Sequence, residues 1–275
     1  MPEPSSESPQ MHSSPPVVVI IAGNDPSGGA GLAADIQTVS ALGCHPAPVV
    51  TSLTVQDTRN AYRVEITDAG LVSEQARAVF ADMPARAVKI GLLPDAATAR
   101  AVADVLADHR HLPIVLDPVL VASGGAALAE ADLVEVLLER LVPLATIVTP
   151  NALEIRRLGG EADGREARAR SLLARGCRWV LVKGADEDTP GVENALYGEG
   201  FSTSYRWGRL PEVYHGSGCT LASAIAAQLA AHRPVPAAVQ DAQRYTYEAL
   251  QKGYRPGQGQ FVPRRMHTPN HEAES

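Results

Sequence analysis

The segment His215-Gly216-Ser217-Gly218-Cys219-Thr220 has the residue types of an anion-binding helix start. An apolar stretch at 221–231 follows it and predicts a helix that begins near Cys219. Small residues at a helix N-terminus leave backbone N–H groups free, and the helix dipole makes this end positive. Such a pocket stabilises a phosphoryl group during its transfer. We also expect this position to favour the thiolate of Cys219, although a small buried cysteine that only packs tightly fits the same pattern.

A second glycine-rich segment, 23–31, follows an apolar run at 17–22. Its glycines allow the backbone to approach a ligand closely, and a helix after them would aim N–H groups at it. It is not a P-loop, because no Lys-Ser or Lys-Thr pair follows. Residues 29–34 do match the dinucleotide pattern, with Asp57 at a plausible distance, so a nicotinamide oxidoreductase is one hypothesis. Against it, the first glycine of a dinucleotide-binding motif ends the strand. Here the first glycine of the motif is Gly29, which lies six positions after Gly23 at the strand end. A plain turn is the other alternative.

Lysine is rare in this sequence, which contains only Lys89, Lys183 and Lys252. The first two each lie near the end of an apolar strand, shortly before a glycine. A buried ammonium group is costly unless it meets an anion. We therefore expect Lys89 and Lys183 either to bind a ligand anion or to pair with an aspartate.

Oxygen-bearing side chains follow two further strands. Asp117 comes after 114–116, and Asn151 and Glu154 come shortly after 146–148. Carboxylate and amide oxygens at strand ends suit a Mg²⁺ ion held through water and phosphate. Asn151 is also a good N-cap for a short helix, which does not exclude the other role.

Two more polar residues could contact a ligand. Gln56 ends the strand expected at 49–55, and its amide, with both donors and an acceptor, can bind the edge of a heterocycle. Asp35 lies one turn into the helix after the glycines, where its carboxylate is either solvated or faces a ligand crevice. Alone, each residue type is more often structural than functional.

Strand-like and helix-like stretches alternate along the chain. Strands are expected at 17–22, 49–55, 62–66, 87–92, 114–116, 146–148 and 179–183, with hairpins at 194–213. Helices are expected at 32–42, 72–83, 96–108, 133–141, 151–158, 165–175, 219–231 and 235–252. This order predicts an α/β fold with one mostly parallel central sheet and helices on both faces. Ligands of such sheets bind at the carboxyl ends of the strands, which directs attention to the residues named above.

Composition restricts the class of protein. The 275 residues carry a formal net charge of −7, which argues against nucleic acid or a membrane surface as the main partner. Three cysteines without metal-site spacing favour the reducing cytoplasm. No targeting segment is visible. We expect disordered tails at 1–16 and 263–275, with one domain at 17–262 between them.

Taken together, these segments resemble the hydroxymethylpyrimidine/phosphomethylpyrimidine kinases of thiamine biosynthesis, in the ribokinase superfamily. The matching segments lie at 22–43, 51–58, 87–93, 115–124, 144–154, 180–184 and 215–227, in the order of that family. Cys219 distinguishes the sequence from most ribokinase-like sugar kinases, which carry an aspartate there. The resemblance implies a dimer that uses Mg-ATP to phosphorylate 4-amino-5-hydroxymethyl-2-methylpyrimidine, and then its monophosphate, to the diphosphate.

The resemblance also implies a role for individual residues. Cys219 would accept the hydroxymethyl proton, and the segment Gly216, Ser217, Gly218 and Cys219 would supply the anion hole. The pyrimidine would be held and surrounded by Gln56, Asp35, Gly23, Ala30, Leu92 and Val119. ATP would meet Lys183, Thr220 and Asn151. Asp117 and Glu154, with Asn151, would organise Mg²⁺, partly through water.

The sequence departs from the family pattern at a few positions. Leu92 replaces a common methionine, Asp57 an asparagine and Asn24 a serine or threonine. Ala185-Asp186 replaces Gly-His, and a common lysine after Ala122 is missing; these two departures bear on the second phosphorylation. The nearest rival function is a pyridoxal or pyridoxine kinase on the same fold. A non-catalytic metabolite-binding protein is the rival from another class, and it would be expected to have lost the anion hole or the acidic residues.

Overall fold

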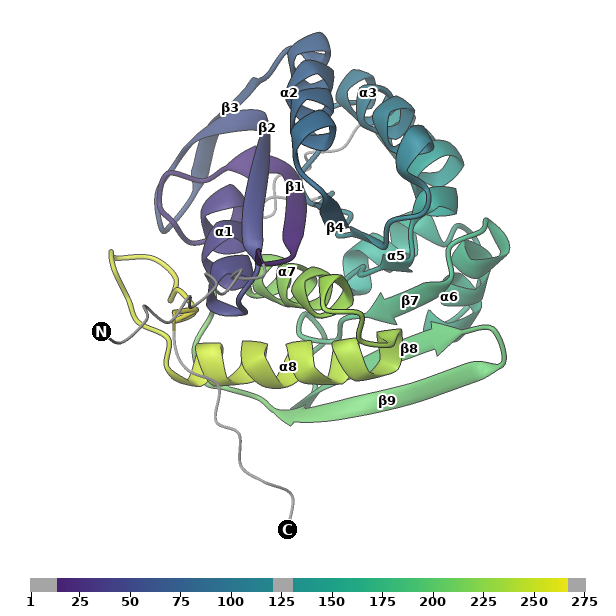
Figure 1. Ribbon diagram of the computed structural model, residues 1–275. Helices are drawn as coiled ribbons and strands as arrows, with labels where there is room; N and C mark the ends of the chain where they lie inside the picture. Colours follow the sequence, from purple (N-terminus) through teal and green to yellow (C-terminus); the bar gives the residue numbers. More distant parts are fainter. Residues whose placement is uncertain (1–13, 121–130, 267–275) are drawn as a thin grey trace, which may run out of the picture.

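One continuous sheet runs through residues 14–120 and 131–266, the part of the chain that the computed structural model describes (Figure 1). Its strand order is β3-β2-β1-β4-β5-β6-β7-β8-β9. The strands are β1 (Val17–Asn24), β2 (His45–Gln56), β3 (Ala61–Ile66), β4 (Ala85–Ile90), β5 (Ile114–Leu116), β6 (Ile147–Val148), β7 (Trp179–Val182), β8 (Gly191–Gly198) and β9 (Phe201–Gly208). Strands β2, β1, β4, β5, β6 and β7 are mutually parallel, and the antiparallel β3, β8 and β9 extend the two edges. The predicted α/β class with a mostly parallel sheet is confirmed.

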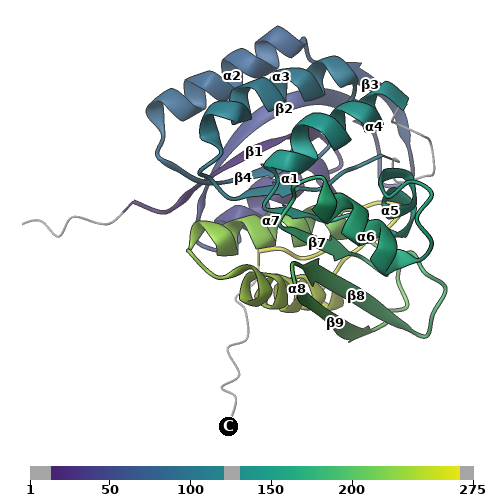
Figure 2. The same ribbon diagram turned by 90° about the vertical axis from the view of Figure 1, so that its right-hand side faces the viewer.

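Helices cover both faces of this sheet (Figures 1 and 2). One face packs against α1 (Gly31–Ala41), α7 (Ser217–Ala230) and α8 (Val235–Gln251). The other packs against α2 (Ala69–Asp82), α3 (Ala96–Leu106), α4 (Ala131–Val136), α5 (Ala152–Leu158) and α6 (Arg165–Ala174). A 3₁₀ turn (Ala107–His109) follows α3, and a π-helical turn (Leu137–Leu141) and a second 3₁₀ turn (Val142–Leu144) follow α4.

The unbroken apolar run of strand β1 is explained by the burial of both of its faces. Val19 and Ile21 face one hydrophobic core, whereas Val18 and Ile20 face the other, and all four are fully buried. A strand with a helix layer on each side has no solvated face, so both sets of alternate side chains are apolar.

Strand β2 begins four residues before the expected start at residue 49. Pro46 and Pro48 fall in this extension, and proline normally argues against a strand. Here the extension pairs only with β1, because β3 joins β2 from Ser52 onward. The first part of β2 is therefore an edge strand, where the missing N–H of proline is tolerated.

The packed chain extends past residue 262, where we expected the domain to end. Arg265 is only 1% exposed. Its guanidinium donates hydrogen bonds to four acceptors: Thr220 Oγ1 at 2.8 Å, the Gly28 carbonyl at 3.2 Å, Gln37 Oε1 at 3.3 Å and the Gly29 carbonyl. Residues 263–266 are therefore not a disordered tail, because Arg265 ties the glycine-rich loop to α7. Residues 14–16 of the expected N-terminal tail are described, and the Pro16 carbonyl accepts the His45 N–H at 2.9 Å. Residues 1–13 and 267–275 lie outside the described residues, as do Ser123 and the glycines after it. None of the described helices is long and apolar enough to span a bilayer.

Candidate active site

The N-terminus of α7 lies at the carboxyl ends of the central strands. Gly216 caps this helix in the left-handed region at φ 81°, and the helix begins at Ser217. A Cβ added to Gly218 would lie 3.2 Å from Lys183 Nζ and 3.9 Å from Asp117 Oδ2. The structure thus brings together the helix start, Lys183 and Asp117, which the sequence placed after three different strands. It also confirms the helix predicted at 219–231.

Asp117 and Lys183 form an ion pair in this region. Lys183 Nζ lies 2.7 Å from Asp117 Oδ1, and the Thr149 hydroxyl donates to the same oxygen at 2.9 Å. Burial opposes the charge on Asp117, but Lys183 and Lys89 outweigh it and lower its pKa. Burial likewise opposes the charge on Lys183, and Asp117 and Glu154 nevertheless raise its pKa. The predicted pairing of Lys183 with an aspartate is confirmed.

Glu154 and Asn151 form a capping box at the start of α5. The Asn151 side-chain oxygen accepts from the Leu153 and Glu154 N–H groups, at 2.9 and 2.8 Å, and Glu154 Oε2 accepts from the Asn151 N–H at 2.8 Å. The cap expected at Asn151 is therefore present and occupies its oxygen. Burial raises the pKa of Glu154 to about 7, and Lys183 only partly offsets this.

This raised pKa predicts how the stability of the metal-free protein depends on pH. The folded chain retains a proton on Glu154 that the unfolded chain, with an ordinary pKa of 4.5, has released. The stabilisation from this group is complete below pH 4.5 and is lost as the pH rises through about 7. Urea unfolding between pH 5 and 8 should show a steeper decline for the native chain than for Glu154→Gln. Identical slopes for the two proteins would contradict the assignment.

Lys89 and Asp35 form a second ion pair, which is completely buried. Lys89 Nζ lies 2.7 Å from Asp35 Oδ2, both side chains are 0% exposed, and the Ser223 hydroxyl donates to Asp35 Oδ1 at 2.7 Å. Burial opposes the charge on Lys89, but Asp35 and other nearby groups raise its pKa, so it remains an ammonium. The alternative that Asp35 is a solvated surface residue is wrong. A ligand that bonds to Asp35 would have to share an oxygen that already accepts a hydrogen bond.

Cys219 lies among these charges, in the first turn of α7. Burial raises the pKa of its thiol to about 11, and Asp35 and Asp117 add to the rise. Lys89 and a hydrogen bond from the Gly31 backbone oppose the rise but do not cancel it. The expectation that this position favours the thiolate is therefore wrong. The helix start and one ammonium do not compensate for burial and two carboxylates.

The expected heterocycle-binding residues lie around the end of β1. A Cβ added to Gly23 would come within 2.6 Å of Ser52 Oγ and 3.1 Å of Leu92 Cδ2, so only glycine leaves this space open. Ala30, Leu92 and Val119 are partly exposed. Gln56 Nε2 lies 2.8 Å from His215 Nε2, which is also 2.8 Å from Asp25 Oδ2.

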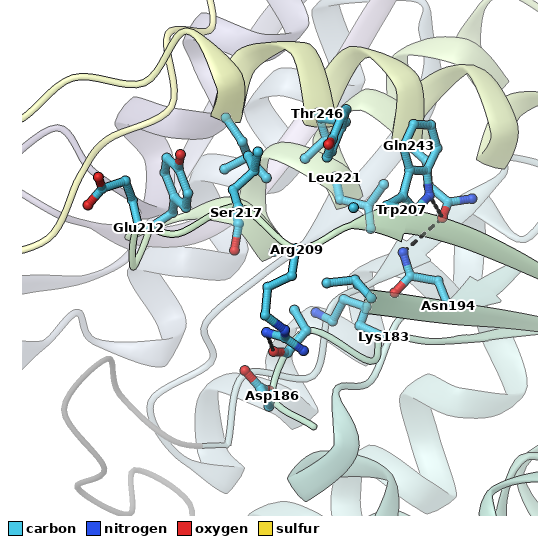
Figure 3. Close-up of a pocket in the computed structure, with 18 of the residues that line it drawn as sticks. Lys183, Asp186, Asn194, Trp207, Arg209, Glu212, Ser217, Leu221, Gln243 and Thr246 are labelled. Atoms are coloured by element: carbon cyan, nitrogen blue, oxygen red, sulfur yellow. Dashed lines mark hydrogen bonds between the residues drawn. The ribbon is translucent and has the colours of Figure 1, made fainter. Parts of the chain in front are cut away.

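A cavity of about 270 Å³ opens beside the α7 N-terminus (Figure 3). It lies between the β8–β9 hairpin, α7 and α8. Residues that line it include Lys183, Asp186, Asn194, Trp207, Arg209, Ser217, Gly218, Leu221, Gln243, Thr246 and Tyr247. Its apolar and aromatic walls, with a few polar groups, are typical of a small-molecule site. Lys183 and Gly218 belong both to this cavity and to the charged cluster, so the two are continuous.

The sequence analysis missed the polar network along this cavity. Gln243 Oε1 accepts from Asn194 Nδ2 at 2.8 Å and from Trp207 Nε1 at 3.1 Å, and Asn194 Oδ1 accepts the Gly184 N–H at 3.0 Å. The available signal was a glutamine within the apolar face of an Ala-rich helix, beside Val239, Ala242 and Thr246. Such a buried amide needs polar partners from another element.

Arg209 was also missed, although it shapes the loop after Lys183. Its guanidinium donates to the carbonyls of Ala185, Glu187 and Thr189, at 3.0, 2.6 and 2.8 Å. These bonds fix the loop in which Ala185-Asp186 replaces the family's Gly-His.

The cluster around Asp117 holds donor groups for a divalent cation. Within the described ranges, no three His, Cys, Asp or Glu side chains are close enough together to form a complete metal cage. Asp117 and Glu154 nevertheless supply carboxylates of the kind that Mg²⁺ prefers, and Asp117 Oδ2 is not the oxygen that Lys183 and Thr149 occupy. The residues therefore fit an ion that keeps several waters and is shared with phosphates, as Mg²⁺ usually is.

Comparison with known proteins matches residues 25–264 to the family described as phosphomethylpyrimidine kinase. A hydroxymethylpyrimidine/phosphomethylpyrimidine kinase of Streptomyces coelicolor is 39% identical over 254 residues, covering 89% of this chain and 92% of its own length. The thiamine biosynthesis bifunctional protein ThiED of Geobacter sulfurreducens is 41% identical over 88% of this chain, which spans only 50% of that longer protein.

Solved structures agree with this grouping. A phosphomethylpyrimidine kinase from Clostridium difficile superposes with a TM-score of 0.75 at 33% identity, over 86% of this chain and 99% of its own. A pyridoxal kinase from Staphylococcus aureus in complex with pyridoxal superposes with a TM-score of 0.84 at 25% identity, over 92% and 94% of the two chains. The fold is thus shared by kinases that act on two different heterocycles.

Proposed function

The chain belongs to the phosphomethylpyrimidine kinase family, and from that premise we propose that it phosphorylates 4-amino-5-hydroxymethyl-2-methylpyrimidine, and then its monophosphate, with Mg-ATP as the donor. The observation that carries the proposal is the cavity at the start of α7, which shares Lys183 and Gly218 with the buried cluster around Asp117. Its apolar and aromatic walls suit the base of a nucleotide, and we assign the heterocycle to the residues around Gln56 and Gly23.

The residues at the start of α7 fit phosphoryl transfer. The free N–H groups of residues 216–219 and the ammonium of Lys183 would stabilise charge on the phosphoryl oxygens as it develops. Mg²⁺ held near Asp117 and Glu154 would neutralise the donor phosphates. Cys219 would accept the proton of the attacking hydroxyl as the thiolate, which forms only after the thiol has lost its own proton because burial raises its pKa to about 11. Since this transfer is largely dissociative, positioning by the helix start matters at least as much as the base.

Pyridoxal kinase is the second candidate, because a pyridoxal kinase superposes well on this chain. Cys219 together with Gln56 favours the pyrimidine. The test is an ATP-dependent assay with the pyrimidine and pyridoxal side by side and mass spectrometry of the products. We expect the pyrimidine mono- and diphosphates. If pyridoxal phosphate forms readily and no phosphorylated pyrimidine appears, the substrate assignment is wrong.

We further propose a homodimer in the cytoplasm. Apolar side chains stand exposed on and next to the β2–β3 edge of the sheet, a suitable surface for a second copy: Leu53, Val55, Tyr62, Ile66 and Leu71. The three cysteines are free thiols, as in proteins of a reducing compartment. Sedimentation equilibrium measures the mass directly, and a value near that of one 29.0 kDa chain would exclude the dimer.

A further inference from the structure

His215 joins the glycine-rich loop to the end of β2. It is 4% exposed, and its Nε2 lies 2.8 Å from both Asp25 Oδ2 and Gln56 Nε2. Gly29 makes room for the ring, because an added Cβ there would come within 2.3 Å of His215 Cδ2. The imidazole is therefore held in place between a carboxylate and an amide.

The hydrogen-bond partners of Asp25 settle which of these groups donates. Asp25 is 5% exposed and accepts backbone N–H groups from Ser27 and Ala30, each at 2.8 Å. Burial opposes its charge, but the bonds from His215 and Ser27 outweigh this and lower its pKa, so the carboxylate is ionised. An ionised carboxylate only accepts hydrogen bonds. The proton in the 2.8 Å contact must therefore reside on His215 Nε2.

This assignment fixes the orientation of Gln56. A protonated Nε2 has no lone pair to accept a bond from an amide N–H₂ group. The two ends of a glutamine amide are nearly identical in shape, so the hydrogen-bond network decides which end faces His215. In the structure the Gln56 nitrogen lies at this contact, so the amide must turn over to bring its oxygen to the Nε2–H group, whose one hydrogen is then shared between this oxygen and Asp25 Oδ2. The N–H₂ group is then left to donate elsewhere.

We propose that His215, held by Asp25, is a positioning residue that turns the Gln56 amide so that its N–H₂ group faces the substrate and recognises an unprotonated ring nitrogen. This proposal rests on the proposed function, because it requires a heterocycle beside Gln56. It assigns Gln56 to a ring acceptor rather than to an exocyclic amino group. A ring with only N–H or C–H at that position would be rejected.

A double-mutant cycle tests whether His215 acts through Gln56. Calorimetry would give the Kd of the hydroxymethylpyrimidine for the native chain, Gln56→Ala, His215→Asn and the double variant. We expect each single change to weaken binding roughly fivefold to over a hundredfold, and His215→Asn to add nothing in the Gln56→Ala background.

His215→Gln, whose longer amide can donate from nearly the same point as Nε2, should retain most of the affinity. If His215→Asn weakened binding by the same factor in the native chain and in Gln56→Ala, the proposal would be overturned. His45→Asn, at an exposed histidine, is the matched control.

A second measurement tests the orientation itself and does not depend on the folding of a His215 variant. Substrate analogues would replace each ring nitrogen in turn by C–H, or lack the amino group, and would be compared on the native chain and Gln56→Ala. We expect the loss from one ring-nitrogen analogue to disappear in Gln56→Ala, and the loss from the missing amino group to remain. If instead the amino group couples to Gln56, the amide faces the other way and the proposal is wrong. If the native chain does not bind the pyrimidine at all, the proposed function itself fails.

Discussion

Replacing Lys89 by methionine is expected to lower the free energy of unfolding by about 3–5 kcal/mol, a large part of the stability of a typical domain. The change leaves the fully buried Asp35 carboxylate without its ammonium partner, with a hydrogen bond from the Ser223 hydroxyl and the repulsion of the nearby Asp117 carboxylate. An uncompensated buried charge is far more costly than the pair itself is stabilising. Urea or thermal unfolding of the two proteins at pH 7 measures the difference.

Two further variants make this result specific. Lys252→Met changes an exposed lysine and should alter stability by no more than about 0.5 kcal/mol. Adding Asp35→Leu to Lys89→Met should restore much of the loss, because a buried pair replaced by apolar residues of similar volume is often close to neutral. If Lys89→Met unfolds at the same urea concentration as the native chain, the prediction is wrong, and the ion pair with Lys89 is not what stabilises the buried Asp35.

Replacing Cys219 by alanine is expected to lower kcat by roughly 10²–10⁴-fold, the usual contribution of a positioned acid or base. Because the pKa of the thiol is raised to about 11, only a small fraction is thiolate at neutral pH. The kcat of the native enzyme should therefore rise from pH 7 to 10 as the thiolate forms. Alkylation of Cys219 by iodoacetamide should accelerate over the same range, and bound pyrimidine should protect it.

Cys219→Asp supplies the matching control, since it places a carboxylate where sugar kinases of this superfamily carry one. It should retain more activity than Cys219→Ala. If Cys219→Ser and Cys219→Ala both keep a near-normal kcat, the cysteine is only a packing residue and has no part in proton transfer. Fast alkylation at neutral pH that does not increase further would show instead that the thiolate is already formed in the free protein.

The sequence predicted the sheet and the helices well because their signals are local. The apolar run of β1 and the glycine stop after α1, where Gly43 has φ 78°, can be read within a few residues. The positions of Asp117, Lys183 and Gly218 were also predictable in outline, because strand ends and helix starts of an α/β fold meet at one edge.

The sequence could not predict the burial of Arg265, the pKa of Cys219 or the role of His215, because each depends on residues that are distant in the chain. Arg265 lies in a polar stretch that is typical of a tail, and its acceptors Gly28 and Gly29 are more than 230 residues away. The pKa of Cys219 depends on two carboxylates, from α1 and the end of β5, and on the depth of the site. Similarly, His215 gained its role only when the fold brought Asp25 and Gln56 to the same ring nitrogen.

The hydrogen bonds of Arg265 also impose an order on the completion of the site during protein synthesis. Translation proceeds from the N-terminus, so Gly28, Gly29 and Thr220 leave the ribosome well before residue 265. Until then, two loop carbonyls and the Thr220 hydroxyl lack the guanidinium that joins them. A nascent chain that already carries every residue of the phosphoryl site therefore still lacks the link between its glycine-rich loop and α7, and this link can form only after residue 265 has been made.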